Sequence, residues 1–177
     1  MKKYLPIYVY GSLIILAGVF LFVSENSPFQ MIKMTLGISL IVGAIFAFVT
    51  AFVRQRQEVQ FAYHQLHALA MLVYGISLVL LCNSTEQLIL FTAFLFVFYA
   101  ASEILFCNWL FNLAQKVVFK IVAVRALLGL VIGVGAVVAM NYAAFSVQLL
   151  GAMFILVGVN ILLYVPVMKA KLTKQIN

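Results

Sequence analysis

Residues 11–18 read GSLIILAG, an apolar stretch that begins and ends with glycine. Two further stretches follow the same rule of a small residue, six residues and a glycine: ALAMLVYG at 68–75 and ALLGLVIG at 126–133. Their first residues are 57 and then 58 positions apart. Residues seven positions apart lie two turns along one face of an α-helix. Each stretch therefore predicts an apolar helix with small residues along one face.

A second series of short motifs lies between these stretches and has nearly the same period. It consists of GAIF at 43–46, ASEI at 101–104 and GVNI at 158–161, in steps of 58 and 57 residues. Two interleaved series with one period indicate three copies of a two-helix unit. The sequence thus predicts one domain of three tandem helical hairpins with approximate threefold pseudo-symmetry. The expected hairpins are residues 4–60, 61–118 and 119–177.

The composition indicates that this domain lies in a lipid bilayer. Hydrophobic residues make up 67% of the chain and charged residues 8%, whereas a soluble domain is about 45–50% apolar. Crossing roughly 30 Å of hydrocarbon takes about 20 apolar residues. Six stretches meet or approach that length, which predicts an all-α membrane protein with six transmembrane helices. The stretches are 4–23, 34–53, 67–82, 88–111, 121–140 and 149–168. The third is short, so its helix is expected to begin in the polar run before it.

The positions of the basic residues predict the orientation in the membrane. Lys and Arg are disfavoured in translocated loops, and in a six-span topology every Lys and Arg except Lys33 falls on one side. We therefore predict a multi-pass protein of a bacterial inner membrane with both termini and loops 54–66 and 112–120 in the cytoplasm. Loops 24–33, 83–87 and 141–148 are expected outside. The net charge of +7 then reflects topology and contact with anionic lipid headgroups, and no nucleic-acid partner is expected.

Aromatic and sulfur-containing residues near the ends of the spans have simple interpretations. Trp and Tyr are enriched at membrane interfaces, and we expect an interfacial position for a set of them. This set is Tyr4, Tyr8, Trp109, Tyr142 and Tyr164. Cys82 and Cys107 fall at opposite depths of the predicted bilayer, too far apart for the roughly 7 Å between Cα atoms that a disulfide allows.

The glycines are expected to let helices approach one another closely. Helix association in lipid depends on van der Waals packing between small residues. A pore-lining role is the alternative, and packing is the favoured interpretation. The predicted packing positions are Gly11, Gly18, Gly37, Gly43, Gly75, Gly129, Gly133, Gly151 and Gly158.

Glu103 and Arg125 are the candidate polar pair inside the membrane. Glu103 lies about eight residues inside the cytoplasmic end of its helix, or about 12 Å deep at 1.5 Å per residue. A carboxylate at that depth is normally paired, protonated or facing water. Arg125, near the start of the next helix, is the nearest cation in an apolar stretch. Because both residues flank one loop, their helices are antiparallel neighbours, and the arginine can reach Glu103.

The repeat places three more polar residues at matching positions. Asn160 corresponds to Glu103, while Tyr10 and His67 correspond to Arg125. If the hairpins close into a ring, Asn160 is expected near Tyr10. These residues are interpreted as polar contacts that fix helix register; a proton or ligand site is the alternative, since such charges are rare in lipid.

No catalytic, cofactor or metal site is predicted. The pair His64 and His67 lies on one helical face, but Glu58 is the nearest acid, and this is too few ligands for a metal. The chain has no H-E-x-x-H, no G-x-S-x-G and no phosphate-binding glycine loop. We therefore expect a protein without enzymatic activity.

The repeat pattern resembles a known family. One helix of each unit has a polar residue, then a small residue and spaced glycines, as in RALLG at 125–129 with Gly133 after it. The partner helix has the pattern G/A-x-E/N-I, at 101–104 and at 158–161. This pattern resembles the HdeD-like family of short-repeat bacterial membrane proteins, over residues 4–168. The chain departs from the family pattern in two ways. The arginine that begins such helices is present only at Arg125, and the proline that often follows the odd-numbered helices is present only as Pro28.

The resemblance implies a six-helix inner-membrane protein of three hairpin repeats, in a family whose named member is associated with resistance to acid stress, and it supplies no established catalytic residues to carry over. We accordingly expect a non-enzymatic, stress-associated membrane factor, with a second copy or another membrane protein as a possible partner. A small transporter or channel that uses Glu103, and an accessory subunit of a membrane complex, are the alternatives.

Overall fold

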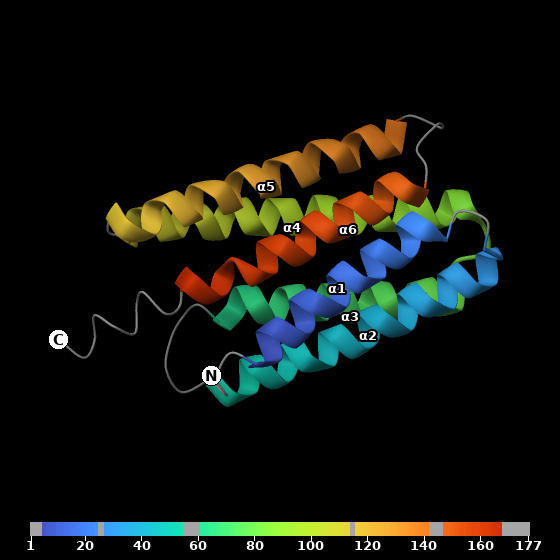
Figure 1. Ribbon diagram of the computed structural model, residues 1–177, viewed down its shortest axis with the longest axis horizontal. Helices are drawn as coiled ribbons and strands as arrows, with labels where there is room; N and C mark the ends of the chain where they lie inside the picture. The colour runs from blue at the N-terminus through green and yellow to red at the C-terminus, as the bar shows by residue number, and fades with distance from the viewer. Residues whose placement is uncertain (1–4, 25–26, 55–60, 114–115, 142–146, 168–177) are drawn as a thin grey trace.

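The computed structural model describes residues 5–24, 27–54, 61–113, 116–141 and 147–167. Side chains are described for these residues except 6, 50–54, 61–66, 112–113 and 116–118. All elements in this part of the chain are α-helices (Figure 1). They are α1 (Leu5–Val23), α2 (Phe29–Arg54), α3 (Phe61–Leu81), α4 (Thr85–Leu113), α5 (Lys116–Asn141) and α6 (Val147–Leu162). The predicted all-α class is confirmed.

The helices lie on the predicted apolar stretches, and several extend beyond them. As expected, α3 begins six residues before His67. The first turns of α2 and α4 occupy residues that were predicted as loop, so loops 24–33 and 83–87 are shorter than expected. Local sequence explains both starts: Pro28, whose fixed φ suits a helix start, precedes α2, and the Ser84 hydroxyl accepts from the backbone N–H of Gln87 at 3.2 Å, capping α4.

Four of the described helices are long and apolar enough to cross a membrane. The qualifying stretches are Phe29–Val49, Thr85–Phe111, Phe119–Asn141 and Val147–Val167. In α1 and α3 the described apolar stretches are shorter, Ile7–Val23 and His67–Leu81. Large aliphatic side chains also cover the outer face of the bundle, as on α5, where Leu127 is 61% and Val134 is 56% exposed. Such a surface suits lipid.

The helices pack in a closed order. Each helix contacts the ones before and after it in the chain, and α6 returns to contact α1. The most extensive interfaces join α1 to α6, α2 to α3 and α4 to α5, whereas α3 with α4 and α5 with α6 meet over smaller areas. In Figure 1, α5 lies along one edge beside α4 and α2 lies along the opposite edge, with α1 and α6 between them. The beginning of α1 and the end of α6 lie at the same end of the bundle.

Glycines make the closest of these contacts. A methyl group added at Gly18 would lie 2.6 Å from the carbonyl oxygen of Gly151, and one at Gly158 would lie 2.8 Å from that of Gly11. A methyl group added at Gly75 would likewise lie 3.0 Å from the carbonyl oxygen of Gly37. No described glycine has a positive φ, so these residues provide room and not an unusual backbone conformation.

Other glycines meet side chains. A methyl group at Gly133 would lie 3.0 Å from the Cβ atom of Ala100, and one at Gly43 would lie 3.3 Å from the Tyr10 ring. The glycines of α5 therefore approach side chains, whereas those joining α1 to α6 and α2 to α3 approach backbone. This difference sets the α4–α5 interface apart from the other two large interfaces.

Candidate functional site

A buried ion pair joins α4 to α5. Nη2 of Arg125 lies 2.6 Å from Oε1 of Glu103, and the two side chains are 3% and 2% exposed. This distance is that of a strong, charge-assisted hydrogen bond. The structure thus brings together the two charges that the sequence places on either side of one loop.

The glycine one turn after Arg125 positions this pair. A Cβ atom at Gly129 would lie 3.3 Å from Cγ of Glu103, so the methylene groups of the glutamate rest against the α5 backbone. Residues four apart lie on one helical face, which places Arg125 and Gly129 together opposite Glu103. Gly129, predicted only as a packing residue, therefore also shapes the polar site.

Two aromatic rings cover the guanidinium. The Arg125 Cζ atom lies 5.0 Å from the centroid of the Tyr164 ring and 5.4 Å from that of Phe106, within the range of cation–π attraction. The interfacial prediction for Tyr164 is wrong, because this residue is buried at 2% exposure. Tyr8 is exposed and Trp109 is partly buried. Tyr4 and Tyr142 lie outside the described residues.

His67 joins the cluster from α3. Its Nε2 atom lies 2.5 Å from the Ser102 hydroxyl, and that hydroxyl donates to the backbone carbonyl of Tyr99 at 2.9 Å. The rings of His67 and Tyr99 are 4.9 Å apart. His67 also lies within electrostatic range of both Glu103 and Arg125. The partly buried imidazole therefore borders the ion pair.

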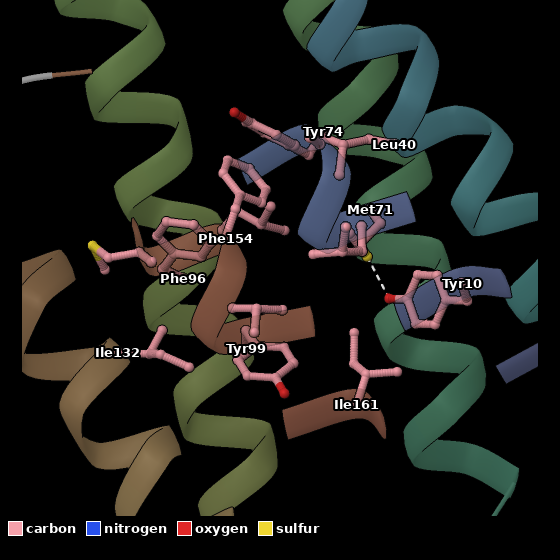
Figure 2. Close-up of a cluster of buried hydrophobic side chains, with 14 of the residues drawn as sticks. Tyr10, Leu40, Met71, Tyr74, Phe96, Tyr99, Ile132, Phe154 and Ile161 are labelled. Carbon is pink, nitrogen blue, oxygen red and sulfur yellow. Dashed lines mark hydrogen bonds between the residues drawn. The ribbon is translucent and has the colours of Figure 1, made fainter. Parts of the chain in front are cut away.

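Asn160 and Tyr10 have partners other than those expected. The Asn160 amide donates to the Tyr99 hydroxyl at 2.9 Å, and the Tyr10 hydroxyl donates to the sulfur of Met71. The predicted contact between Asn160 and Tyr10 is thus replaced by hydrogen bonds to α4 and α3. Figure 2 shows the hydroxyls of Tyr10 and Tyr99 on either side of the same interior region. Tyr99, at the centre of the cluster, joins α4 to α6 by a hydrogen bond.

The cluster is closely packed. A cavity of about 10 Å³ borders it, lined by His67, Met71, Phe96, Tyr99, Phe154 and others. This is room for about one water molecule. The rings of Phe96 and Phe154 meet edge to face at 4.8 Å on the side of the cluster that faces Tyr74 (Figure 2). Glu103 itself is enclosed, with 1% of its surface exposed.

A separate pair of polar contacts lies toward the other end of the bundle. Lys33, expected in an external loop, is instead on α2 and 6% exposed, and its ammonium donates to the carbonyl oxygen of Cys82 at 2.7 Å. Cations are favourable at helix C-termini, so Lys33 binds the carbonyl that follows α3. Between this contact and the Phe96–Phe154 pair, the hydroxyls of Tyr74 and Thr92 are 2.5 Å apart.

The described residues contain no group of three or more His, Cys, Asp and Glu side chains that could hold a metal. The side chain of His64 and all of Glu58 lie outside the described part. Cys82 and Cys107 are free and buried. Cys107 lies one turn from Glu103, and its thiol is 3.5 Å from Oε1 of Glu103.

Sequence reasoning missed three members of the cluster: Tyr99, Ser102 and Tyr164. Two of them carry a positional signal, because Tyr99 precedes Glu103 by four residues and Tyr164 follows Asn160 by four, so each lies on the face of a predicted polar residue. Ser102 is adjacent to Glu103 and carries no comparable signal.

The arrangement unites the polar residues of several helices in one interior region, with charges that neutralise each other. No family model matches the chain, and no curated protein or solved structure matches it either.

Proposed function

We propose that the chain is a multi-pass inner-membrane protein without enzymatic activity, whose polar cluster holds a closed helical bundle together. The enclosure of the Glu103–Arg125 pair carries this proposal. A carboxylate that serves as a transport site has to meet water or substrate. Glu103 instead lies 2.6 Å from its counter-ion with 2% of its side chain exposed. A short and enclosed ion pair is what a structural contact requires.

The proposed topology has six spans, both termini in the cytoplasm and approximate threefold pseudo-symmetry of the hairpins. The packing order supports it, since the three largest interfaces each join an even-numbered helix to the odd-numbered helix of the next hairpin, with α6 and α1 closing the order. The glycine pairs support it as well, because Gly18 with Gly151 and Gly75 with Gly37 make matching contacts at two of the three interfaces.

We further propose that this protein acts as a stress-associated membrane factor of the kind that the HdeD-like family represents. Support comes from the sequence pattern of three short hairpin repeats and from the many large aliphatic side chains exposed on the outer faces of the described helices, which suit a bilayer. A tightly packed bundle that lets no protons through is suited to a membrane under acid conditions.

Proton flux into proteoliposomes tests the structural interpretation. The wild-type chain and its Glu103→Gln variant are reconstituted with a pH-sensitive dye inside, and an inward proton gradient is applied. We expect fluxes equal to those of protein-free liposomes for both, and a less stable Glu103→Gln protein in denaturant. A pH-dependent flux in the wild type that a folded Glu103→Gln variant loses would establish the transporter alternative.

Survival after acid shock tests the stress role. Bacteria that express the chain are compared with bacteria that express a Gly18→Val variant, in which the added side chain is directed at the Gly151 carbonyl. We expect higher survival with the wild-type chain. Equal survival of both cultures at equal membrane levels of protein would remove the stress role while leaving the architecture unaffected.

A further inference from the structure

An apolar cavity lies between α3, α4 and α6. It measures about 10 Å³, and the surface that encloses it is apolar. His67 and Tyr99 border the cavity, but their polar atoms have partners outside it. Nε2 of His67 lies beside the Ser102 hydroxyl. The Tyr99 hydroxyl accepts from the Asn160 amide. A cavity without polar partners stays dry and takes apolar ligands, so this one is a candidate site for a hydrocarbon group.

The cavity lies just inside the outer surface of the bundle, between α3 and α4. These two helices meet over a smaller area than α2 with α3 or α4 with α5. Two of the residues that line the cavity also reach the outer surface: Phe98 on α4 is 41% exposed, and Ala70 on α3 is partly buried. Phe154, which lines the cavity from α6, is 0% exposed. The cavity therefore extends from the lipid-facing side at Ala70 and Phe98 to the interior at Phe154.

The cavity is at the middle of the helices that form it. Met71, one of its lining residues, is the central residue of α3, and Tyr99 is the central residue of α4. Phe154 is likewise at the middle of α6, and Figure 2 shows Met71, Tyr99 and Phe154 around one interior region. In a bilayer with about 30 Å of hydrocarbon, helices that span it have their middle residues near the midplane. That is the depth at which the acyl chains of the two leaflets end.

Size, depth and chemistry together identify the ligand. The cavity holds one group of about the size of a water molecule, and a methyl group is of similar size. Because lipid headgroups stay at the membrane surfaces, a lipid can reach this depth only with the end of its acyl chain. We propose that the methyl end of a lipid acyl chain inserts between α3 and α4 and fills this cavity against Phe154. The site rests on the membrane location of the bundle and adds a bound lipid to its structural role.

Solid-state NMR on the protein in phospholipid bilayers tests this site through the methionine methyl groups. These groups are isotope-labelled in an otherwise deuterated protein, and transfer of magnetisation to them from the acyl-chain protons is measured. Met71 lines the cavity and is 4% exposed. The matched control is Met153, which is 6% exposed and packs against Gly135 instead. Met34, at 38% exposure, gives the upper reference, and bilayers with deuterated acyl chains give the background.

We expect transfer to Met71 to be several-fold faster than transfer to Met153, although exposure alone would rank Met153 slightly higher. Equal transfer to both would overturn the proposal, and this comparison in the parent protein is decisive by itself. Ala70→Leu places a larger apolar side chain at the outer side of the cavity, so it should lower the transfer to Met71 toward that of Met153 and leave Met34 unchanged. Undiminished transfer to Met71 in the folded variant would also overturn the proposal, since lipid would then reach Met71 by another route. Both results are independent of whether the protein resists acid or conducts protons.

Discussion

An unpaired charge has a high free energy in lipid, and the buried charged residues of this protein are placed beside partners that lower it. Glu103 and Arg125 neutralise each other at 2.6 Å. Lys33 is buried, yet its ammonium reaches a carbonyl at the end of the neighbouring helix. Each of these three buried charges thus has a partner on an adjacent helix or just after its end, which ties a local electrostatic need to the packing of two helices.

Removing one member of the ion pair is expected to destabilise the protein more than removing both. Breaking a buried pair leaves an uncompensated charge and typically costs about 3–5 kcal/mol, so Arg125→Gln is expected in that range and Glu103→Gln somewhat below it. The double variant should recover part of the loss, with a coupling energy of about 0.5–3 kcal/mol. Denaturant unfolding in detergent micelles measures all three.

The matched control for this cycle is Glu86→Gln, which removes an exposed acid at the start of the same helix. It should change the free energy of unfolding by less than about 0.5 kcal/mol. Additive losses from Glu103→Gln and Arg125→Gln would show that the two side chains do not act as a pair.

Cys82 is expected to react slowly with thiol reagents. It lies just after the last residue of α3 and is 0% exposed, and burial raises the pKa of its thiol. A raised thiol pKa means less of the reactive thiolate at neutral pH, so alkylation should be slow at pH 7 and accelerate as the pH rises above the usual range. The alkylation rate of Cys82 is compared with that of a cysteine at the exposed neighbouring position, made by Asn83→Cys in a Cys82→Ala background. Equal rates at pH 7 would contradict the buried position of Cys82.

At the scale of helices, the interfaces use two different means of holding together. Between α1 and α6, and between α2 and α3, glycines bring backbones into contact, and dispersion over many atoms provides the attraction. Between α4 and α5, Ala100 and Glu103 stand opposite the glycines of α5, and the ion pair contributes instead. Two of the three large interfaces between hairpins therefore rest on backbone packing at glycines, and the third adds charge pairing.

Alanine substitutions distinguish these glycines. Gly18→Ala would place a methyl group 2.6 Å from a backbone carbonyl that cannot turn aside, so we expect a loss of about 1–3 kcal/mol from overpacking. At Gly135 the nearest atom is the mobile end of Met153, at 3.1 Å. Gly135→Ala should thus be neutral or slightly stabilising, because alanine is favoured over glycine in helices by roughly 0.5–1 kcal/mol. Unfolding measurements that rank Gly135→Ala as the more harmful change would contradict this account of α1 and α6.

The sequence predicted the elements better than it predicted their contacts. Apolar stretches and glycine spacing located all six described helices, because length and hydropathy are local properties. The ion pair could also be predicted from the sequence, since its two residues flank one short connection. The partners of Asn160 and Tyr10 could not be predicted, because they depend on the relative shift and rotation of helices that are distant in the chain. Tyr164 was misassigned for a related reason: a tyrosine near the end of a span can face either lipid headgroups or a buried guanidinium.

The whole molecule combines an apolar exterior with a polar interior region, the reverse of a soluble helical bundle. Phe96 and Phe154 lie between that region and the Tyr74–Thr92 contact (Figure 2), so the polar groups form two levels separated by aromatic rings. Large exposed aliphatic side chains surround both levels. A protein of this kind depends on lipid for its fold and on its few polar groups for the relative positions of its helices.

The proposed topology predicts opposite accessibility at the two ends of the bundle. In a Cys-free background, Asn83→Cys should react with a membrane-impermeant maleimide added to intact cells, and Lys120→Cys should react only after the membrane is opened. Both positions are exposed, so a difference in rate reports the side of the membrane and not burial. Labelling of Lys120→Cys from outside intact cells would reverse the orientation that the basic residues predict.

The location of the ion pair on consecutive helices has a consequence for biogenesis. Chains emerge from the ribosome with the N-terminus first, so Glu103 reaches the bilayer before Arg125 does. An unpaired acid within a span raises the free energy of insertion by several kcal/mol. The glutamate must therefore remain protonated or stay beside the insertion machinery until α5 arrives. A nascent chain truncated after residue 113 and followed by an inert linker that fills the ribosomal tunnel should consequently crosslink to the translocon from α4 for longer than the same chain carrying Glu103→Leu, and including residues 114–141 before the linker should abolish that difference.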